Sequence, residues 1–190
     1  MSDDYTDLRG VLPGLTAAQA QLYAYGCALR LAPVVDLCAE PETAELYGRG
    51  LAAARTLGPA AERAELARAL RAVPENEGES AEEKAYWVYH AALVLVGALI
   101  LTEAEEPAAE AVRVCAHSLN LHENLDYEVD PDAPRPGPVE RAEVAEQFAS
   151  IDTARGTDDR AAAVTEIARR AAGHRDLLGA VLPPIAEEWV

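Results

Sequence analysis

The densest group of potential metal ligands in the sequence lies in residues 115–130, which read CAHSLNLHENLDYEVD. A cysteine, two histidines and four carboxylates fall there, and these residue types bind zinc or transfer protons: Cys115, His117, His122, Glu123, Asp126, Glu128 and Asp130. Side chains on one helix converge when they are three or four residues apart, whereas His117 and His122 are five apart. A single helix therefore does not direct both histidines at one ion.

The convergent set on such a helix is Cys115, Ser118 and His122, which form an inward stripe that ends in a polar residue. A zinc site needs three or four ligands, so a second helix would have to contribute. The residue that we single out as a ligand from a second helix is His90, in the apolar stretch upstream. We interpret these histidines as structural residues of the core, and we predict no metal site and no cofactor.

Sequence motifs of common enzyme classes are absent. The chain has no GxSxG, HExxH, Walker A or GxGxxG segment. The acidic stretch DYEVDPD lacks the glycine and the final glutamate of an EF-hand loop. Ser118 and His122 are four apart, but no orienting acid or oxyanion-binding segment accompanies them. These absences favour a binding protein over an enzyme.

The net charge of −17, from 33 acidic and 16 basic residues, limits the classes of partner. A chain this acidic repels phosphate backbones, and no basic stripe interleaved with aromatic residues is present. We therefore expect no nucleic acid and no anionic membrane surface as partner. A basic protein is the partner that such a charge would attract, with electrostatic steering of the encounter.

The cellular setting is predicted from small signals. Cys27, Cys38 and Cys115 form no CxxC pair, which is typical of free thiols in a reducing compartment. The N-terminal segment MSDDYTDLRG is acidic and does not resemble a secretion leader. Fifteen arginines against the single Lys84, with abundant alanine, indicate GC-rich coding. We expect a cytoplasmic protein of bacterial origin.

The composition and the helix signals predict an all-α fold. Segment 85–101, AYWVYHAALVLVGALIL, is uncharged, but a helix of this length spans only about 25 Å against a hydrocarbon core of about 30 Å. We expect one domain, 1–190, in which seven or eight helices surround a hydrophobic central helix at about 81–102. Capping boxes at Thr16–Gln19 and Ser80–Glu83 would open helices. Residues 124–138 hold four prolines and four acids and predict a surface loop.

The segment LTAAQAQLYAYGCALRLAPVVDLCAE resembles the opening of the YjaG-type family of uncharacterised bacterial helical proteins. The places of the family pattern are taken by Gln19 or Gln21, Cys27, Arg30 and Pro33. The resemblance continues through AVPENEGES, EPAAEAVRVCAHSLN and PVERAEVAEQF, so that it covers most of residues 15–150. It implies a compact all-helical domain and brings no activity with it.

This chain departs from the family pattern at two places. Ala28 or Leu29 stands where the family has an acidic residue before the arginine. Val34 and Val35 stand where it has aromatic residues after the proline. A family site at this position would be incomplete here.

Two hypotheses about function follow. The first is a non-catalytic interaction protein, of the immunity or inhibitor type, that binds a basic protein through its acidic surface. The alternative is an enzyme, or a protein that binds a small ligand or metal, with a pocket lined by Tyr86, Tyr89, His90, Cys115 and His122. A homodimer through an alanine-rich face is compatible with both.

Overall fold

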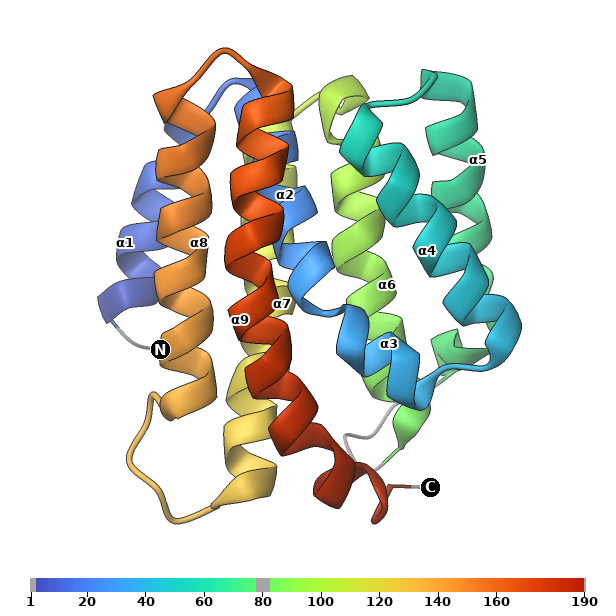
Figure 1. The fold of residues 1–190 in the computed structure, drawn as a ribbon, viewed down its shortest axis with the longest axis vertical. Coiled ribbons are helices and arrows are strands. Elements are labelled where there is room, and N and C mark those ends of the chain that lie inside the picture. Colours follow the sequence, from blue (N-terminus) through green and yellow to red (C-terminus); the bar gives the residue numbers. More distant parts are fainter. Residues whose placement is uncertain (1–2, 78–82, 190) are drawn as a thin grey trace.

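The computed structural model describes residues 3–77 and 83–189, and in these residues the chain folds as a bundle of helices without strands (Figure 1). The all-α prediction is confirmed. The helices are α1 (Asp3–Val11), α2 (Ala17–Arg30), α3 (Ala32–Cys38), α4 (Pro41–Thr56), α5 (Ala60–Leu70), α6 (Lys84–Ile100), α7 (Pro107–Val129), α8 (Pro138–Gly156) and α9 (Arg160–Ala186). Short 3₁₀ turns lie at Leu12–Gly14, Pro74–Glu77 and Leu101–Glu103.

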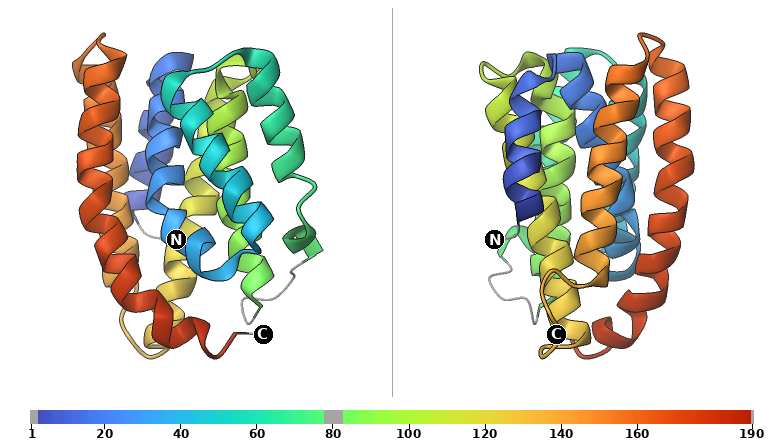
Figure 2. Two further views of the ribbon diagram at one scale, coloured as in Figure 1. Left: turned by 45° about the vertical axis from the view of Figure 1, so that its right-hand side comes forward. Right: turned by 90° about the vertical axis from the view of Figure 1, so that its left-hand side faces the viewer.

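Two helices, α2 and α6, form the centre of the bundle. Helix α6 packs against α2, α3, α4, α5 and α7, and its C-terminal half from Val94 to Leu99 is almost completely buried. Helix α2 packs against α6 and also against α7, α8 and α9. Figure 2 shows α8 and α9 as an outer pair on one side and α4 and α5 as a pair on the other. The bundle therefore has two central helices, the predicted α6 and also α2.

One helical stretch, Lys84–Glu103, is apolar and long enough to cross a membrane by length and composition. In this structure 61% of its most apolar window is buried inside the bundle.

Local capping signals place the helix starts. Thr16 and Gln19 form the predicted capping box, with hydrogen bonds of 3.0 and 3.3 Å between each side chain and the other residue's backbone. This arrangement satisfies two backbone N–H groups that the first turn leaves open. The second predicted box, Ser80–Glu83, lies partly outside the described residues, as do residues 81 and 82 of the predicted central helix.

The acidic loop begins later than the sequence predicts. Helix α7 continues to Val129, so residues 124–129 are helical and only 130–137 connect α7 to α8. Leu125 is completely buried, and the Asp126 carboxylate accepts hydrogen bonds from the Val139 and Glu140 N–H groups at 3.0 and 2.8 Å. Asp126 thereby caps the first turn of α8, which keeps the end of α7 helical.

Candidate functional site

An ion pair between Arg30 of α2 and Glu143 of α8 lies at the centre of a buried polar cluster. Arg30 donates to the two carboxylate oxygens of Glu143 at 2.6 and 2.9 Å, and the two side chains are 1% and 0% exposed. Burial alone would raise the pKa of the Glu143 carboxyl, but the guanidinium opposes this and holds that pKa well below its usual range. Glu143 is therefore ionised at neutral pH.

Further side chains hold the Glu143 carboxylate in place. Ser118 of α7 and Gln147 of α8 donate to its Oε1 atom at 2.7 and 2.9 Å. The Tyr23 hydroxyl donates to the Gln147 amide oxygen at 2.7 Å, and Arg30 also donates to the Ser150 hydroxyl at 3.2 Å. Because these groups converge from α2, α7 and α8 and are buried, the orientation of the carboxylate is fixed on several sides.

Two histidines face the remaining side of this carboxylate. His122 of α7 and His174 of α9 bring their Nε2 atoms within 2.9 Å of each other, and Glu143 Oε2 lies 3.7 and 3.6 Å from these atoms. The His122 and His174 side chains are 0% and 1% exposed. Burial lowers the pKa of both rings, to about 3 for His174, so both are neutral at pH 7.

Hydrogen bonding fixes which ring nitrogens carry protons. His122 Nδ1 lies 2.6 Å from the Ser118 carbonyl oxygen, which only accepts, so this nitrogen must donate. His122 Nε2 therefore has a free lone pair. The 2.9 Å contact then requires that His174 donate from Nε2, which leaves His174 Nδ1 as a bare acceptor. Among the described residues this buried nitrogen has no hydrogen-bond partner.

The structure separates the residues of the predicted pocket. His90 was expected to join His122, but the Nδ1 atom of His90 instead lies 3.1 Å from Nδ1 of His117. Tyr86 and Tyr89 flank His90 with ring centroids 4.4 and 5.3 Å away. This half-buried group on α6 and α7 is distinct from the buried cluster around His122.

Cys115 belongs to neither histidine group. Its thiol is buried near the Tyr23 hydroxyl, and burial raises the pKa of Cys115 to about 11. A thiol that keeps its proton at neutral pH is a poor nucleophile and a poor metal ligand.

Sequence reasoning missed Glu143 and His174. In the structure, Glu143, Gln147, Ser150 and Ala154 follow one another at spacings of three or four and all are buried. A mostly polar stripe of this period predicts a solvent-facing side of a helix, so the sequence carries no signal that Glu143 is buried. His174 lies in the same way between the buried residues Ala171 and Leu178.

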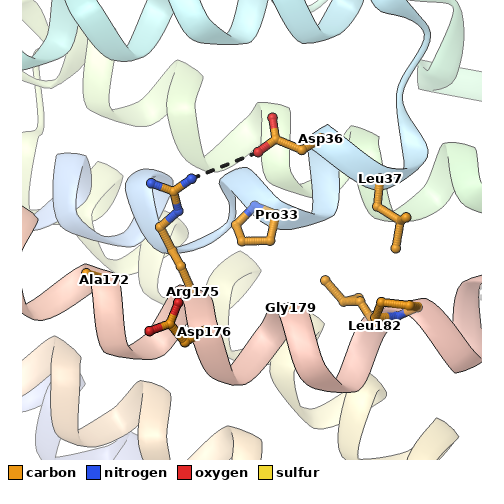
Figure 3. Close-up of a pocket in the computed structure, with 9 residues that line it drawn as sticks. Pro33, Asp36, Leu37, Ala172, Arg175, Asp176, Gly179 and Leu182 are labelled. Carbon is orange, nitrogen blue, oxygen red and sulfur yellow. Dashed lines mark ion pairs between the residues drawn. The ribbon is translucent and has the colours of Figure 1, made fainter.

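Two open grooves border the C-terminal half of α9. The first, of about 540 Å³, lies between α3 and α9 and is lined by Pro33, Asp36, Leu37, Ala172, Arg175, Asp176, Gly179, Leu182 and Pro183. Figure 3 shows Pro33 and Leu37 facing α9, with the Asp36–Arg175 ion pair of 4.0 Å across the groove. The second, of about 390 Å³, is lined by Glu128, Val129, Ala180, Val181, Pro184, Ile185 and Glu188.

Comparison with protein-family models, with curated proteins and with solved structures found no match to this chain. The chemistry that the molecule can perform is therefore inferred from its geometry alone. That geometry offers a sealed cluster of histidines and a carboxylate, and an open surface on either side of α9.

Proposed function

We propose that the protein is a non-catalytic binding protein that docks a basic protein partner on the C-terminal half of α9. The observation that carries this proposal is where exposed apolar side chains lie. The large apolar residues that stand open to solvent in the described chain are Leu37, Tyr127 and Val129, at 43%, 55% and 52% exposure. Leu37 lines one groove beside α9 and Val129 lines the other, whereas Tyr127 lies against Arg135 and is not among the residues that line either groove.

The surface between the grooves suits close approach of a partner. Exposed residues of α9 there are mostly small or apolar: Ala172, Gly173, Gly179, Ala180, Pro183 and Pro184. Small side chains allow the backbone of a partner element to come near, and exposed apolar patches rimmed by polar residues mark interaction sites.

The charge around these grooves is complementary to a basic partner. Four carboxylates and one guanidinium line them, and that guanidinium, on Arg175, is paired with Asp36. The chain as a whole carries a net charge of −17. A cationic partner would therefore be attracted from a distance and oriented near α9.

The buried cluster supports a non-catalytic role. Glu143 and His122 are 0% exposed, so a substrate could not reach the groups whose types suit acid–base chemistry. The free cysteines fit the cytoplasmic setting that the sequence predicts. We also propose that the protein acts as an immunity or inhibitor protein and that it belongs to the YjaG-type family.

The test compares two charge-reversal variants of the full chain. Asp176→Lys/Glu188→Lys changes the proposed docking face, and Glu62→Lys/Glu65→Lys makes the same change in net charge on the exposed face of α5. A partner is first captured from lysate of the source cell at low salt, identified and purified, and its Kd is then measured by calorimetry at two salt concentrations.

We expect a basic partner whose affinity falls at least tenfold with the α9 variant and less than threefold with the α5 variant. Affinity should also fall steeply with salt. Equal losses with both variants would show attraction to overall charge only and would overturn the docking face. A partner that is not basic, or salt-independent binding, would overturn the proposed chemistry.

The alternative, a small-ligand site near His90, has one observation in its favour. A groove of about 370 Å³ next to the His90–His117 pair is lined by His117, Arg71, Arg113 and Glu110 together with apolar residues of α6. Arg113 is paired with Glu110, so Arg71 is the cation that would meet a small anion here. Thermal-shift screening of carboxylates and phosphates tests this idea, and Arg71→Ala should abolish any shift that binding in this groove produces.

A further inference from the structure

We propose that His122, Glu143 and His174 form a binding site for one divalent transition-metal ion of the zinc class. This inference is independent of the docking face on α9. The three side chains come from α7, α8 and α9, and each offers one ligand atom within 4.8 Å of the others. Two imidazole nitrogens and one carboxylate oxygen are a donor set that zinc and ferrous ions accept.

The spacing of the three atoms fits an ion at bonding distance. The Nε2 atoms are 2.9 Å apart, and Glu143 Oε2 is 3.7 and 3.6 Å from them. The point equidistant from all three atoms is about 2.0 Å from each, and zinc bonds to histidine nitrogen and carboxylate oxygen are about 2.0–2.2 Å long. An ion could bind here with little movement of the helices.

The groups behind the ligands are those that metal sites need. His122 donates from Nδ1 to the Ser118 carbonyl oxygen, which fixes the tautomer and leaves Nε2 as the nitrogen whose lone pair can bind the proposed ion. Ser118 and Gln147 donate to Oε1 of Glu143, and Arg30 Nε donates to Oε2. A carboxylate oxygen accepts at two lone pairs, so Oε2 keeps one for the ion.

Binding of the ion requires only one proton to move. Without an ion, His174 donates from Nε2 to His122 Nε2, and its own Nδ1 has no partner among the described residues. With an ion, His174 would coordinate through Nε2 and hold the same proton on Nδ1. Both rings stay neutral, and the number of protons on the cluster does not change.

The charge of Arg30 sets a limit on the affinity. Its guanidinium neutralises Glu143, so the ion would enter a cluster whose ion pair is neutral overall. Asp126, 2% exposed and near His122, adds negative charge to the surroundings. We therefore expect a site of moderate affinity that prefers zinc, cobalt or ferrous ions, which accept neutral nitrogen ligands, over magnesium or calcium.

The experiment titrates the full-length protein, freed of metal by dialysis against a chelator, with Co²⁺ and with Zn²⁺. Visible absorption of Co²⁺ reports nitrogen ligation, and competition with a chromophoric chelator gives the stoichiometry and Kd for Zn²⁺. We expect one ion per chain, with Mg²⁺ unable to displace it. Failure of the folded wild-type protein to bind one Zn²⁺ per chain would overturn the proposal.

A matched control comes from the other histidine pair. His174→Asn should weaken Zn²⁺ binding by at least 100-fold, whereas His117→Asn should change it less than threefold. The pair His90–His117 also brings two ring nitrogens together, Nδ1 to Nδ1 at 3.1 Å, but it belongs to no three-ligand group in the described chain. The reverse pattern would place the ion at the half-exposed pair and overturn the assignment.

A second measurement needs no variant, in case His174→Asn does not fold. The chain has four histidines, so their ring nitrogens give few signals in ¹⁵N correlation spectra. Zn²⁺ should shift Nε2 of His122 and His174 and convert His174 to the Nδ1–H tautomer. His90 and His117 should keep their shifts, and a spectrum in which only they change would overturn the proposal.

Discussion

Arg30 and Glu143 are 113 residues apart in the sequence and meet in the core through two hydrogen bonds of 2.6 and 2.9 Å. Their ion pair joins α2 to α8, and Ser118 and His122 extend it to α7. A buried pair of this kind adds little net stability compared with apolar side chains of similar size, but loss of one partner leaves a bare charge in the core. The pair therefore specifies how these helices meet.

The first prediction concerns this pair. Arg30→Met should lower the free energy of unfolding by about 3–5 kcal/mol, because Glu143 would stay buried without its countercharge. Arg30→Met combined with Glu143→Gln should recover part of that loss. Urea titration followed by fluorescence of the stacked Trp87 and Trp189 rings measures both variants.

The control for this prediction is an exposed ion pair. Arg169 and Glu166 have side chains 68% and 41% exposed. Arg169→Met should therefore leave the free energy of unfolding almost unchanged. If Arg30→Met and Arg169→Met had similar effects, the Arg30–Glu143 pair would not be the buried contact described.

The second prediction concerns the close contact of α6 and α7. A Cβ atom at Gly97 would come within 2.3 Å of Val114 Cγ2, and valine has few other rotamers on a helix. Gly97→Ala should therefore destabilise the protein by about 1–3 kcal/mol. Gly48→Ala, on α4 with nothing within 4 Å of its added Cβ, should instead stabilise it by about 0.5–1 kcal/mol. Thermal melting distinguishes the two signs, and equal signs would contradict the close approach.

The third prediction concerns the cap that α7 provides to α8. Asp126→Ala removes an acceptor from two backbone N–H groups at 3.0 and 2.8 Å and should cost about 2 kcal/mol, because these groups are buried. Asp159→Ala removes the ordinary N-cap of α9 and should cost about 1 kcal/mol. Hydrogen exchange of the first turn of α8 should speed up in Asp126→Ala only. Unchanged exchange there would contradict the role of Asp126.

The fourth prediction concerns acid stability. Burial and the neighbouring His117 lower the pKa of His90 to about 4, whereas a histidine in the unfolded chain titrates near 6.5. Between these values the unfolded chain binds more protons, so the stability from a neutral His90 is present above pH 6.5 and is lost as the pH falls towards 4.

His90→Gln should therefore lose less stability than the wild type between pH 6.5 and 4.5, as measured by urea unfolding at several pH values. Glu110 and Arg113 act on His117 in opposite directions and are unchanged in this variant. Parallel curves for the two proteins would show that folding does not lower the pKa of His90.

Much of the fold could be predicted from local patterns. The 17 residues of Lys84–Ile100 form an apolar helix because their side chains can be buried on nearly every side. The Thr16–Gln19 box acts through its own backbone, so its spacing alone predicts the start of α2. The end of α7 was misplaced because the feature that maintains it, Asp126 beneath α8, depends on a contact between helices.

The sequence by itself determined that this is an all-helical and strongly acidic protein, since helix periodicity, capping and charge are properties of neighbouring residues. Only the tertiary structure decided which histidines meet. His122 pairs with His174 across 52 residues, and His90 pairs with His117. The rotation and packing of whole helices set these distances, and spacing within one helix carries no information about them.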